Sequence, residues 1–230
     1  MKKYFELTVS CEPEIIGVNN GVCQGNIIWK KFKSKKTIAD IHEYFSLKRY
    51  RTNLSIIETF SFYLEYVEAY KSAKMTDLFL FSPALWGIKF FVTDTTKNLL
   101  KKFKLPVHSY IPVKVYHRER EYDYWALYIP CFYDANSIDY KKTIFFKGSE
   151  IIGKDFIQFK DKEEWYENKV FGAEKLCFNE NFDDSFDLFY SSFGGRGYYI
   201  SEQLKIAIEE ARLSGIVIHE TKEPELILPA

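Results

Sequence analysis

The chain has 230 residues, enough for one large domain or two small ones, and 47% of them are hydrophobic, which excludes a disordered polypeptide. Its 32 Lys and Arg balance 32 Asp and Glu, and no apolar run reaches the length of a membrane span. The N-terminal residues lack an apolar stretch of signal-peptide length, and the four cysteines are scattered, so we predict a cytoplasmic protein.

Charge is uneven along the chain although the total is balanced. Residues 1–115 contain 18 Lys and Arg against 10 Asp and Glu, whereas residues 116–230 contain 14 against 22. Such asymmetry indicates a charged partner surface, or two halves that attract each other or mix their charges on the folded surface. The acidic second half argues against a nucleic-acid partner, because nucleic-acid-binding domains usually carry a net positive charge.

The first 92 residues predict strands around one short helix. Thr37 is expected to cap a helix that ends near Phe45. Residues 54–70 fit either a helix or a strand, and the alternation of aromatic residues favours a strand over 60–67. Further strands are predicted at 3–9, 26–30 and 87–92.

A strand–helix–strand unit is predicted twice, with corresponding residues 108 positions apart. The copies at 91–105 and 199–213 each contain a Thr or Ser cap, then an acidic residue, and a Lys four residues after the cap. The caps are Thr93 and Ser201. The repetition indicates an internal duplication, but capped amphipathic helices between strands are common, so chance similarity is the alternative.

The segment between the two copies is rich in aromatic residues. Residues 122–132 and 138–146 predict two long strands of an antiparallel meander, and 117–121 predicts a charged hairpin turn. A polar helix is expected at 160–168, between short strands at 156–159 and 175–178. The proline-containing tail to residue 230 is predicted to be loosely held.

Together these elements predict an α+β fold. It would be mostly antiparallel sheet, with two or three amphipathic helices packed on one side. We divide the chain into a strand and helix region at 1–75 and an α+β domain at 76–230, which we expect to form one continuous globule.

The sequence contains no motif for catalysis or metal binding. No His or Cys stands at ligand spacing from another, and neither a Gly-x-Ser-x-Gly motif nor a phosphate-binding fingerprint occurs. We therefore predict a protein that is not an enzyme, with no catalytic residues, cofactor or metal.

Two segments are candidates for partner binding. Glycines around Arg196 permit backbone N–H groups to converge on an anion, although a tight loop before a strand is the preferred explanation. An acidic stretch interleaves carboxylates with phenylalanines, as an apolar anchor ringed by negative charge would, or as a solvated loop with its phenylalanines tucked inward. The acidic candidates are Glu180, Phe182, Asp183, Asp184, Phe186 and Asp187.

Several of these motifs resemble a known family. Val92-Thr-Asp followed by Lys97, then Leu-Pro-x-His108, then Ile138-Asp-Tyr-Lys, stand in an order similar to bacterial polymorphic-toxin immunity proteins, in the group named for a myxobacterial immunity protein. The run Ser201-Glu-Gln-Leu-Lys resembles a helix near the C-terminus of that group. The resemblance covers roughly 75–220 and implies a non-catalytic antitoxin that binds a cognate toxin domain.

The alternative is a small-ligand-binding module or an enzyme. It would use Gly194, Arg196 and Tyr198, with the tyrosine rings lining a pocket. A deep cleft with convergent polar groups would favour this alternative, whereas a shallow, charged, aromatic face would favour the antitoxin.

Overall fold

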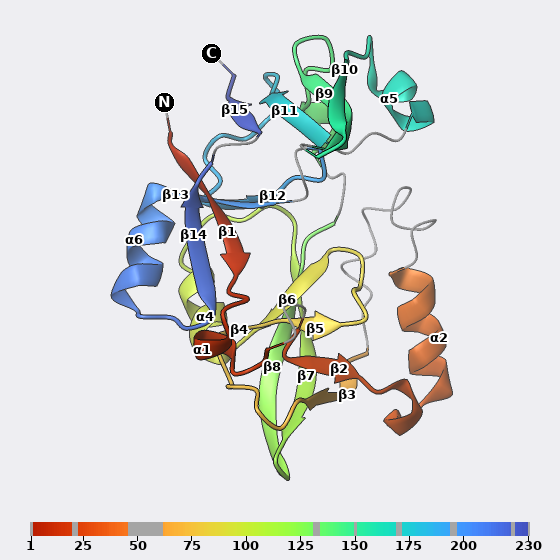
Figure 1. Cartoon of the computed structure of the whole chain (residues 1–230), viewed down its shortest axis with the longest axis vertical. Coiled ribbons are helices and arrows are strands. Elements are labelled where there is room, and N and C mark those ends of the chain that lie inside the picture. Colours follow the sequence, from red (N-terminus) through yellow and green to blue (C-terminus); the bar gives the residue numbers. More distant parts are fainter. Residues whose placement is uncertain are drawn as a thin grey trace. The chain divides into compact units, whose positions relative to one another are not determined.

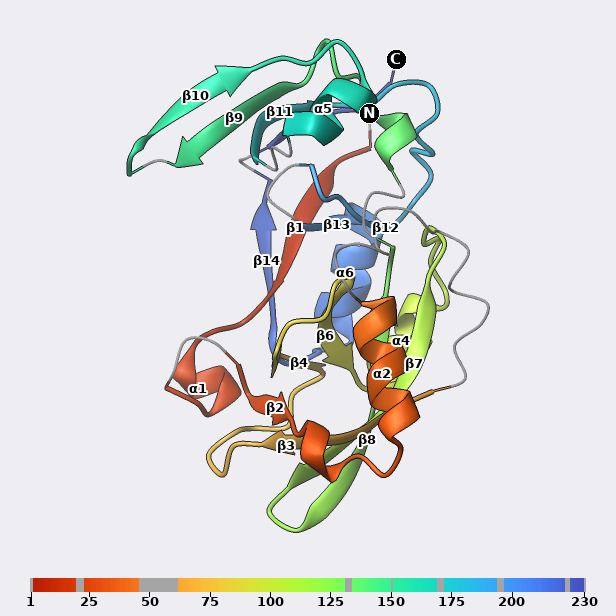
Figure 2. The same cartoon turned by 90° about the vertical axis from the view of Figure 1, so that its right-hand side faces the viewer.

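Contacts between residues divide the chain into two compact units. The computed structural model describes residues 2–19, 23–45, 62–130, 134–149, 151–168, 172–193, 197–221 and 224–229 (Figures 1 and 2). Unit 1 comprises Met1–Leu7, Cys131–Lys205 and Ile218–Ala230, and unit 2 comprises Thr8–Pro130 and Ile206–Val217. The chain therefore divides at positions other than residue 75.

The charge asymmetry of the sequence follows these two units. Unit 2 contains 19 Lys and Arg against 14 Asp and Glu, and unit 1 contains 13 against 18. Each unit is built from segments that are distant in sequence. The charge imbalance is therefore a property of the two folded units as well as of the two halves of the sequence.

A seven-stranded sheet forms the centre of unit 2. Its strand order is β4-β6-β8-β7-β3-β2-β5, and it is mixed because β3 runs parallel to β7 and β2 runs parallel to β5. The strands are β2 (Gly25–Ile27), β3 (Leu64–Ala69), β4 (Leu78–Phe79), β5 (Phe81–Ser82), β6 (Ile88–Val92), β7 (Ser109–His117) and β8 (Arg120–Tyr128). Strands β3 and β6 lie close to two of the predicted strands.

The side chains of the β7–β8 hairpin alternate between a buried face of this sheet and an open face. Ile111, Val113 and Val115 are at most 1% exposed, and they alternate with Pro112 and Lys114, which reach solvent. Their partners on β8 follow the same alternation, because the register is continuous from end to end. We call the side that carries Lys114 the outer face.

Helices lie on both faces of the seven-stranded sheet. On the outer face, Trp125 Nε1 donates to the carboxylate of Asp94 in α4 (Asp94–Leu100) over 2.8 Å. On the buried face, the ring of Phe45, which ends α2 (Lys35–Tyr44), lies 5.7 Å from that of Tyr128. Trp125 and Tyr128 are three residues apart on one strand and point to opposite faces. The prediction that the helices pack on one side is therefore wrong.

Unit 1 contains two further sheets. One has the order β10-β9-β11-β15, and the other, in which β1 and β14 continue into unit 2, has the order β12-β13-β1-β14. The strands are β1 (Tyr4–Val9), β9 (Ile144–Ser149), β10 (Gly153–Ile157), β11 (Gly172–Cys177), β12 (Leu188–Tyr190), β13 (Tyr198–Ser201), β14 (Ile216–Glu220) and β15 (Glu225–Ile227). The tail is thus held as β15, which pairs with β11.

The predicted meander of 122–132 and 138–146 does not form. Strand β8 pairs with β6 and β7, whereas β9 pairs with β10 and β11 in a different sheet. The second predicted strand begins late because the Asp139 carboxylate accepts a hydrogen bond from the backbone of Lys142, which closes a turn over these residues.

Five α-helices are present in the described residues, against the two or three predicted. They are α1 (Pro13–Ile16), α2, α4, α5 (Lys162–Asn168) and α6 (Glu202–Glu210), with short 3-10 helices η1 (Trp29–Lys31) and η3 (Ala135–Ser137). Over the part of the chain that is described, none of the helices has the length and apolarity of a membrane span. The fold is α+β, with mostly antiparallel pairing.

The predicted caps of the two repeated helices are confirmed. The hydroxyl of Thr93 accepts from the backbone N–H of Thr96, and that of Ser201 accepts from the backbone N–H of Leu204. The third predicted cap is wrong, because Ser34 caps α2 in place of Thr37. Serine and threonine are both good capping residues. The helix can start one turn earlier because lysine has a high helix propensity, so Lys35 and Lys36 can form its first turn.

The two copies also share their surroundings. Strands β6 and β7 flank β8, and strands β13 and β14 flank β1. The Lys of each helix lies over an aromatic ring of that central strand: Lys97 Nζ is 2.8 Å from the ring centre of Trp125, and Lys205 Nζ is 4.8 Å from that of Phe5. In the second copy the central strand comes from the start of the chain.

Removing either cap is expected to destabilise the protein by about 1 kcal/mol, because one N–H at the helix start loses its acceptor. Thr93→Ala and Ser201→Ala would each be compared with Thr95→Ala, an exposed threonine in the first turn of α4 that caps nothing. Urea denaturation followed by circular dichroism measures the effect. Equal losses for Thr93→Ala and Thr95→Ala would contradict the capping role.

Candidate functional site

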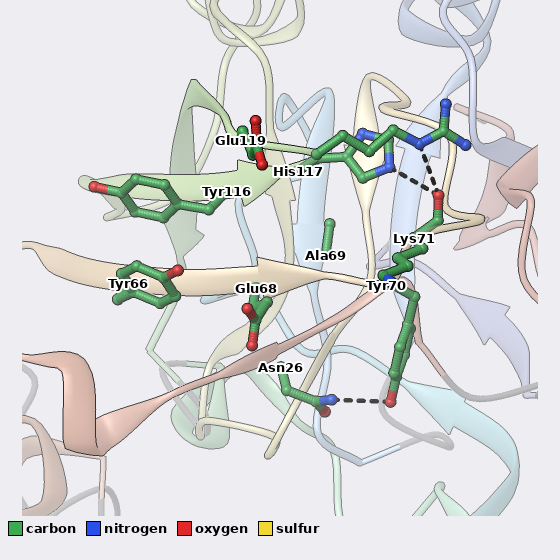
Figure 3. A pocket seen from close by; sticks show the side chains of 10 residues that line it. Asn26, Tyr66, Glu68, Ala69, Tyr70, Lys71, Tyr116, His117 and Glu119 are labelled. Atoms are coloured by element: carbon green, nitrogen blue, oxygen red, sulfur yellow. Dashed lines mark hydrogen bonds between the residues drawn. The ribbon is translucent and has the colours of Figure 1, made fainter.

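The outer face of unit 2 is hollowed where β2, β3 and the β7–β8 turn meet. Figure 3 shows this pocket, whose volume is about 960 Å³. Three tyrosine rings, two carboxylates and several basic groups share it. Its lining residues are Asn26, Tyr66, Glu68, Ala69, Tyr70, Lys71, Tyr116, His117, Arg118 and Glu119.

A stacked pair of tyrosines forms one wall. The rings of Tyr66 on β3 and Tyr116 on β7 lie 4.2 Å apart with an interplanar angle of 12°. An irregularity of β3 between Leu64 and Val67 shifts the register against β7. Without this bulge Tyr66 would share the buried face of Leu64, two residues earlier. With it, Tyr66 lies on the outer face together with Glu68.

Two lysines are held in place by carboxylates and tyrosine hydroxyls around this pair. Lys114 Nζ lies 2.6 Å from both Glu121 and Asp123, and these hydrogen bonds raise the pKa of Lys114. Lys31 donates to the Tyr66 hydroxyl over 2.7 Å and lies 3.4 Å from Glu68. Hydrogen bonds from Lys114 and Tyr116 lower the pKa of Glu121, so these groups stay charged at neutral pH.

The β7–β8 turn forms the other wall and has an unusual backbone. Arg118 and Glu119 have φ angles of 49° and 67°, the left-handed region that a two-residue hairpin turn requires and that glycine or asparagine usually fills. Arg118 Nε, at 2.9 Å, and His117 Nε2, at 3.2 Å, both approach the carbonyl oxygen of Lys71. The charged hairpin turn predicted at 117–121 is confirmed.

The charged side chains beside the hollow pair with one another and with tyrosine hydroxyls. Lys31, Lys114 and Glu121 are engaged by oppositely charged or hydroxyl groups, which keeps them charged and leaves them poor proton shuttles near pH 7. In the described ranges, no three His, Cys, Asp or Glu side chains are grouped to hold a metal ion. Tyrosine rings combine apolar area with a hydroxyl and are common in protein interfaces.

The acidic stretch predicted as a partner site folds partly inward. Phe182 is 6% exposed, and its ring lies 4.1 Å from that of Phe178 and 5.2 Å from that of Phe189. Phe182 is therefore part of the core and not a surface anchor, in agreement with the alternative of a loop whose phenylalanines are tucked inward. Glu180 and Asp184 are exposed.

Asp187 of this stretch is tied to the start of the chain, whereas Asp183 is bonded within its own loop. Lys2 Nζ donates to Asp187 over 3.1 Å and to the carbonyl oxygen of Phe186 over 2.7 Å, and Asp187 also accepts from the Ser201 hydroxyl. Asp183 accepts from the backbone N–H of Ser185. Burial and the nearby carboxylates raise the pKa of Tyr4, whose hydroxyl donates to the same loop. Asp187 thus has a structural role in this conformation.

The glycine-rich loop falls largely outside the described residues. Gly194 and Arg196 belong to the segment 194–196, which is not described. Tyr198 and Tyr199, expected to line a pocket there, are 2% and 1% exposed. Their rings lie in the core of unit 1.

Comparison with known proteins adds no relative. A scan against protein-family models matches none, and a search of curated proteins finds no matching sequence. The likeness to immunity proteins therefore rests on the sequence motifs themselves.

The stacked pair of Tyr66 and Tyr116 was not predicted from the sequence, although the sequence contains a signal for the position of Tyr66. Tyr66 and Glu68 follow the alternation that predicts a strand, and they occupy its polar positions. That alternation does not reveal that β7 lies beside β3, with 39 residues between them in the chain, so neither the stack nor the hollow could be predicted from it.

Proposed function

We propose that this chain is a non-catalytic immunity protein that acts in the bacterial cytoplasm, where it binds a cognate toxin domain and blocks it. The observation that carries the proposal is the outer face of unit 2, where the Tyr66–Tyr116 stack lies among charged side chains. A charged surface that is rich in tyrosine has the composition that favours a protein partner.

The chemistry of the face supports tight binding by a few residues. Tyrosine, tryptophan and arginine supply most of the binding energy in protein interfaces, and here Tyr66, Tyr70 and Tyr116 border one hollow. The rings are already fixed, Tyr116 by Glu121 and Tyr66 by Lys31, so little side-chain entropy is lost on binding. An immobile aromatic surface of this kind suits an inhibitor.

The acidic stretch retains a smaller role in the proposal. With Phe182 buried, its exposed carboxylates Glu180 and Asp184 would act through charge, by speeding encounter with a basic toxin and not by anchoring it. The alternative of a ligand-binding module or enzyme at Gly194, Arg196 and Tyr198 has less support, since the Tyr198 ring is buried.

We also propose that the two strand–helix–strand copies arose by internal duplication. Matching caps, matching lysines over aromatic rings and the same flanking of a central strand are three independent similarities. A chance resemblance of capped helices accounts for the first of these but not for the other two.

Loss of either stacked tyrosine is expected to weaken toxin binding by about thirtyfold or more, because an aromatic anchor at the centre of an interface is worth about 2 kcal/mol or more. The test is co-expression with a candidate toxin domain, sought among the genes next to this one, followed by calorimetry on the purified complex. Tyr66→Ala and Tyr116→Ala would be measured against Tyr63→Ala, which is 41% exposed outside the hollow.

A charge-reversed double variant separates the contribution of the acidic stretch from that of the outer face. Glu180→Lys with Asp184→Lys is expected to slow association and change its salt dependence, with a smaller effect on dissociation. Failure of the wild-type chain to bind or neutralise the toxin would overturn the proposed function. If both tyrosine variants still neutralise the toxin normally, the outer face is not the surface that binds the toxin.

A further inference from the structure

Strand β10 ends one sheet of unit 1 with an open edge. Among the strands that the structure describes, β10 pairs with β9 alone, and Figure 2 shows the β9–β10 hairpin projecting away from α5 and β11. The outward edge of such a strand carries backbone N–H and C=O groups that can pair with a further strand.

Three of the seven exposed large hydrophobic residues in the described part of the chain lie in this hairpin. Ile151 is 94% exposed, Ile152 is 80% exposed and Phe156 is 56% exposed. Phe156 stands opposite Phe146, whose ring lies flat over Gly172 of β11, where a Cβ would come within 2.7 Å of it. The aromatic surface thus runs across the sheet and stops at the open edge.

The other sheet edges are short or interrupted, apart from β14, which has five residues but ends in the exposed polar residues His219 and Glu220. Strands β4 and β5 have two residues each, with Pro83 directly after β5, and β12 and β15 have three, with Pro224 directly before β15. Strand β10 has five residues and no proline. Short strands and prolines are the usual protection of an edge against pairing, and β10 has neither.

The charges on β10 favour a different chain over a second copy of this one. Lys154 and Asp155 are consecutive and point to opposite faces of the sheet. Two copies of β10 paired antiparallel over their full length would be related by an axis at Asp155, which would place this carboxylate opposite its own copy. A heterologous strand can instead place a base beside Asp155 and an acid beside Lys154.

We propose that an extended segment of the toxin adds to β10 as a further strand. Its side chains would be apolar beside Phe156 and Ile157, basic beside Asp155 and acidic beside Lys154, with an apolar surface for Ile151 and Ile152. This inference rests on the proposed function, because it assigns a second contact to the same toxin.

Hydrogen exchange of the chain alone and in complex with the co-expressed toxin domain tests the inference. The amides of 153–157 are expected to exchange at least about tenfold more slowly in the complex, because a new strand would protect those on the free edge. Phe156→Thr, and Ile151→Ser with Ile152→Ser, are expected to weaken binding about tenfold or more. The matched control is Val107→Thr, an apolar residue of unit 2 that is 64% exposed.

The outcomes distinguish the two proposals. A complex in which the 153–157 amides are unchanged, and in which Phe156→Thr binds as well as Val107→Thr, overturns the strand addition and leaves the proposed function standing. Protection of these amides in the isolated chain, with a dimer on sizing chromatography, also overturns it. Absence of any complex overturns both.

Discussion

Replacing Asp134 by Asn is expected to stabilise unit 1 by a few kcal/mol at pH 8 and to remove most of its loss of stability between pH 4 and pH 7. Asp134 is 1% exposed, and burial raises its pKa to about 7, while the neighbouring Ser191 hydroxyl opposes this only in part. The unfolded chain releases the same proton near pH 4. The folded state therefore holds the proton over a range in which the unfolded state has lost it.

The sign of the pH effect follows from this difference. Below about pH 4 both states are protonated and Asp134 costs nothing, whereas between pH 4 and 7 stability falls as the pH rises, by up to about 4 kcal/mol for three pKa units. Above pH 7 the buried carboxylate is charged and the full penalty remains. Tyr140 and Tyr199 lie near enough for Asp134 to raise their pKa as well, and neither supplies a positive charge.

Trp165, the single tryptophan of unit 1, reports on this unit when the chain is labelled with fluorotryptophan. Its fluorine resonance during urea denaturation at pH 5, 6, 7 and 8 gives the pH profile for wild type and Asp134→Asn. The control is Asp139→Asn, a carboxylate that pairs with Lys142 at 3.0 Å. Parallel profiles for wild type and Asp134→Asn would show that Asp134 does not titrate in this range.

Gln24→Leu is expected to destabilise unit 2 by about 3 kcal/mol, because it leaves several buried polar groups without partners. Gln24 is fully buried, and its amide nitrogen donates to the carbonyl oxygen of Lys74 over 2.7 Å and to the hydroxyl of Thr76 over 2.8 Å. Its amide oxygen accepts from the backbone N–H of Leu80 over 3.0 Å. Leucine has a similar volume but can replace none of these bonds.

The matched variant is Asn98→Leu on the exposed side of α4 in unit 2, which should change stability by less than about 0.5 kcal/mol. Urea denaturation followed through the tryptophans of unit 2 measures both. A loss below about 1 kcal/mol for Gln24→Leu would mean that water or a backbone shift satisfies the three groups.

Local signals in the sequence correctly predicted several elements of the fold. Alternation of apolar residues located β1 and β6, and the Thr93 and Ser201 caps located the starts of two helices, because capping and alternation depend on neighbouring residues alone. The charged turn at Arg118 and Glu119 was predictable for the same reason. The assignment of Thr37 as a cap failed because Ser34, only three residues earlier, provides the same chemistry.

Pairing between distant segments could not be predicted from local patterns. The stack of Tyr66 on Tyr116 depends on β3 lying parallel to β7, and the burial of Phe182 depends on its packing against Phe178 and Phe189. Composition and periodicity determined the fold class and the positions of individual strands and helices in this protein. The tertiary structure alone decided which strands became neighbours, which face remained open and which carboxylate was buried, since these depend on the free energy of contacts between residues far apart in the chain.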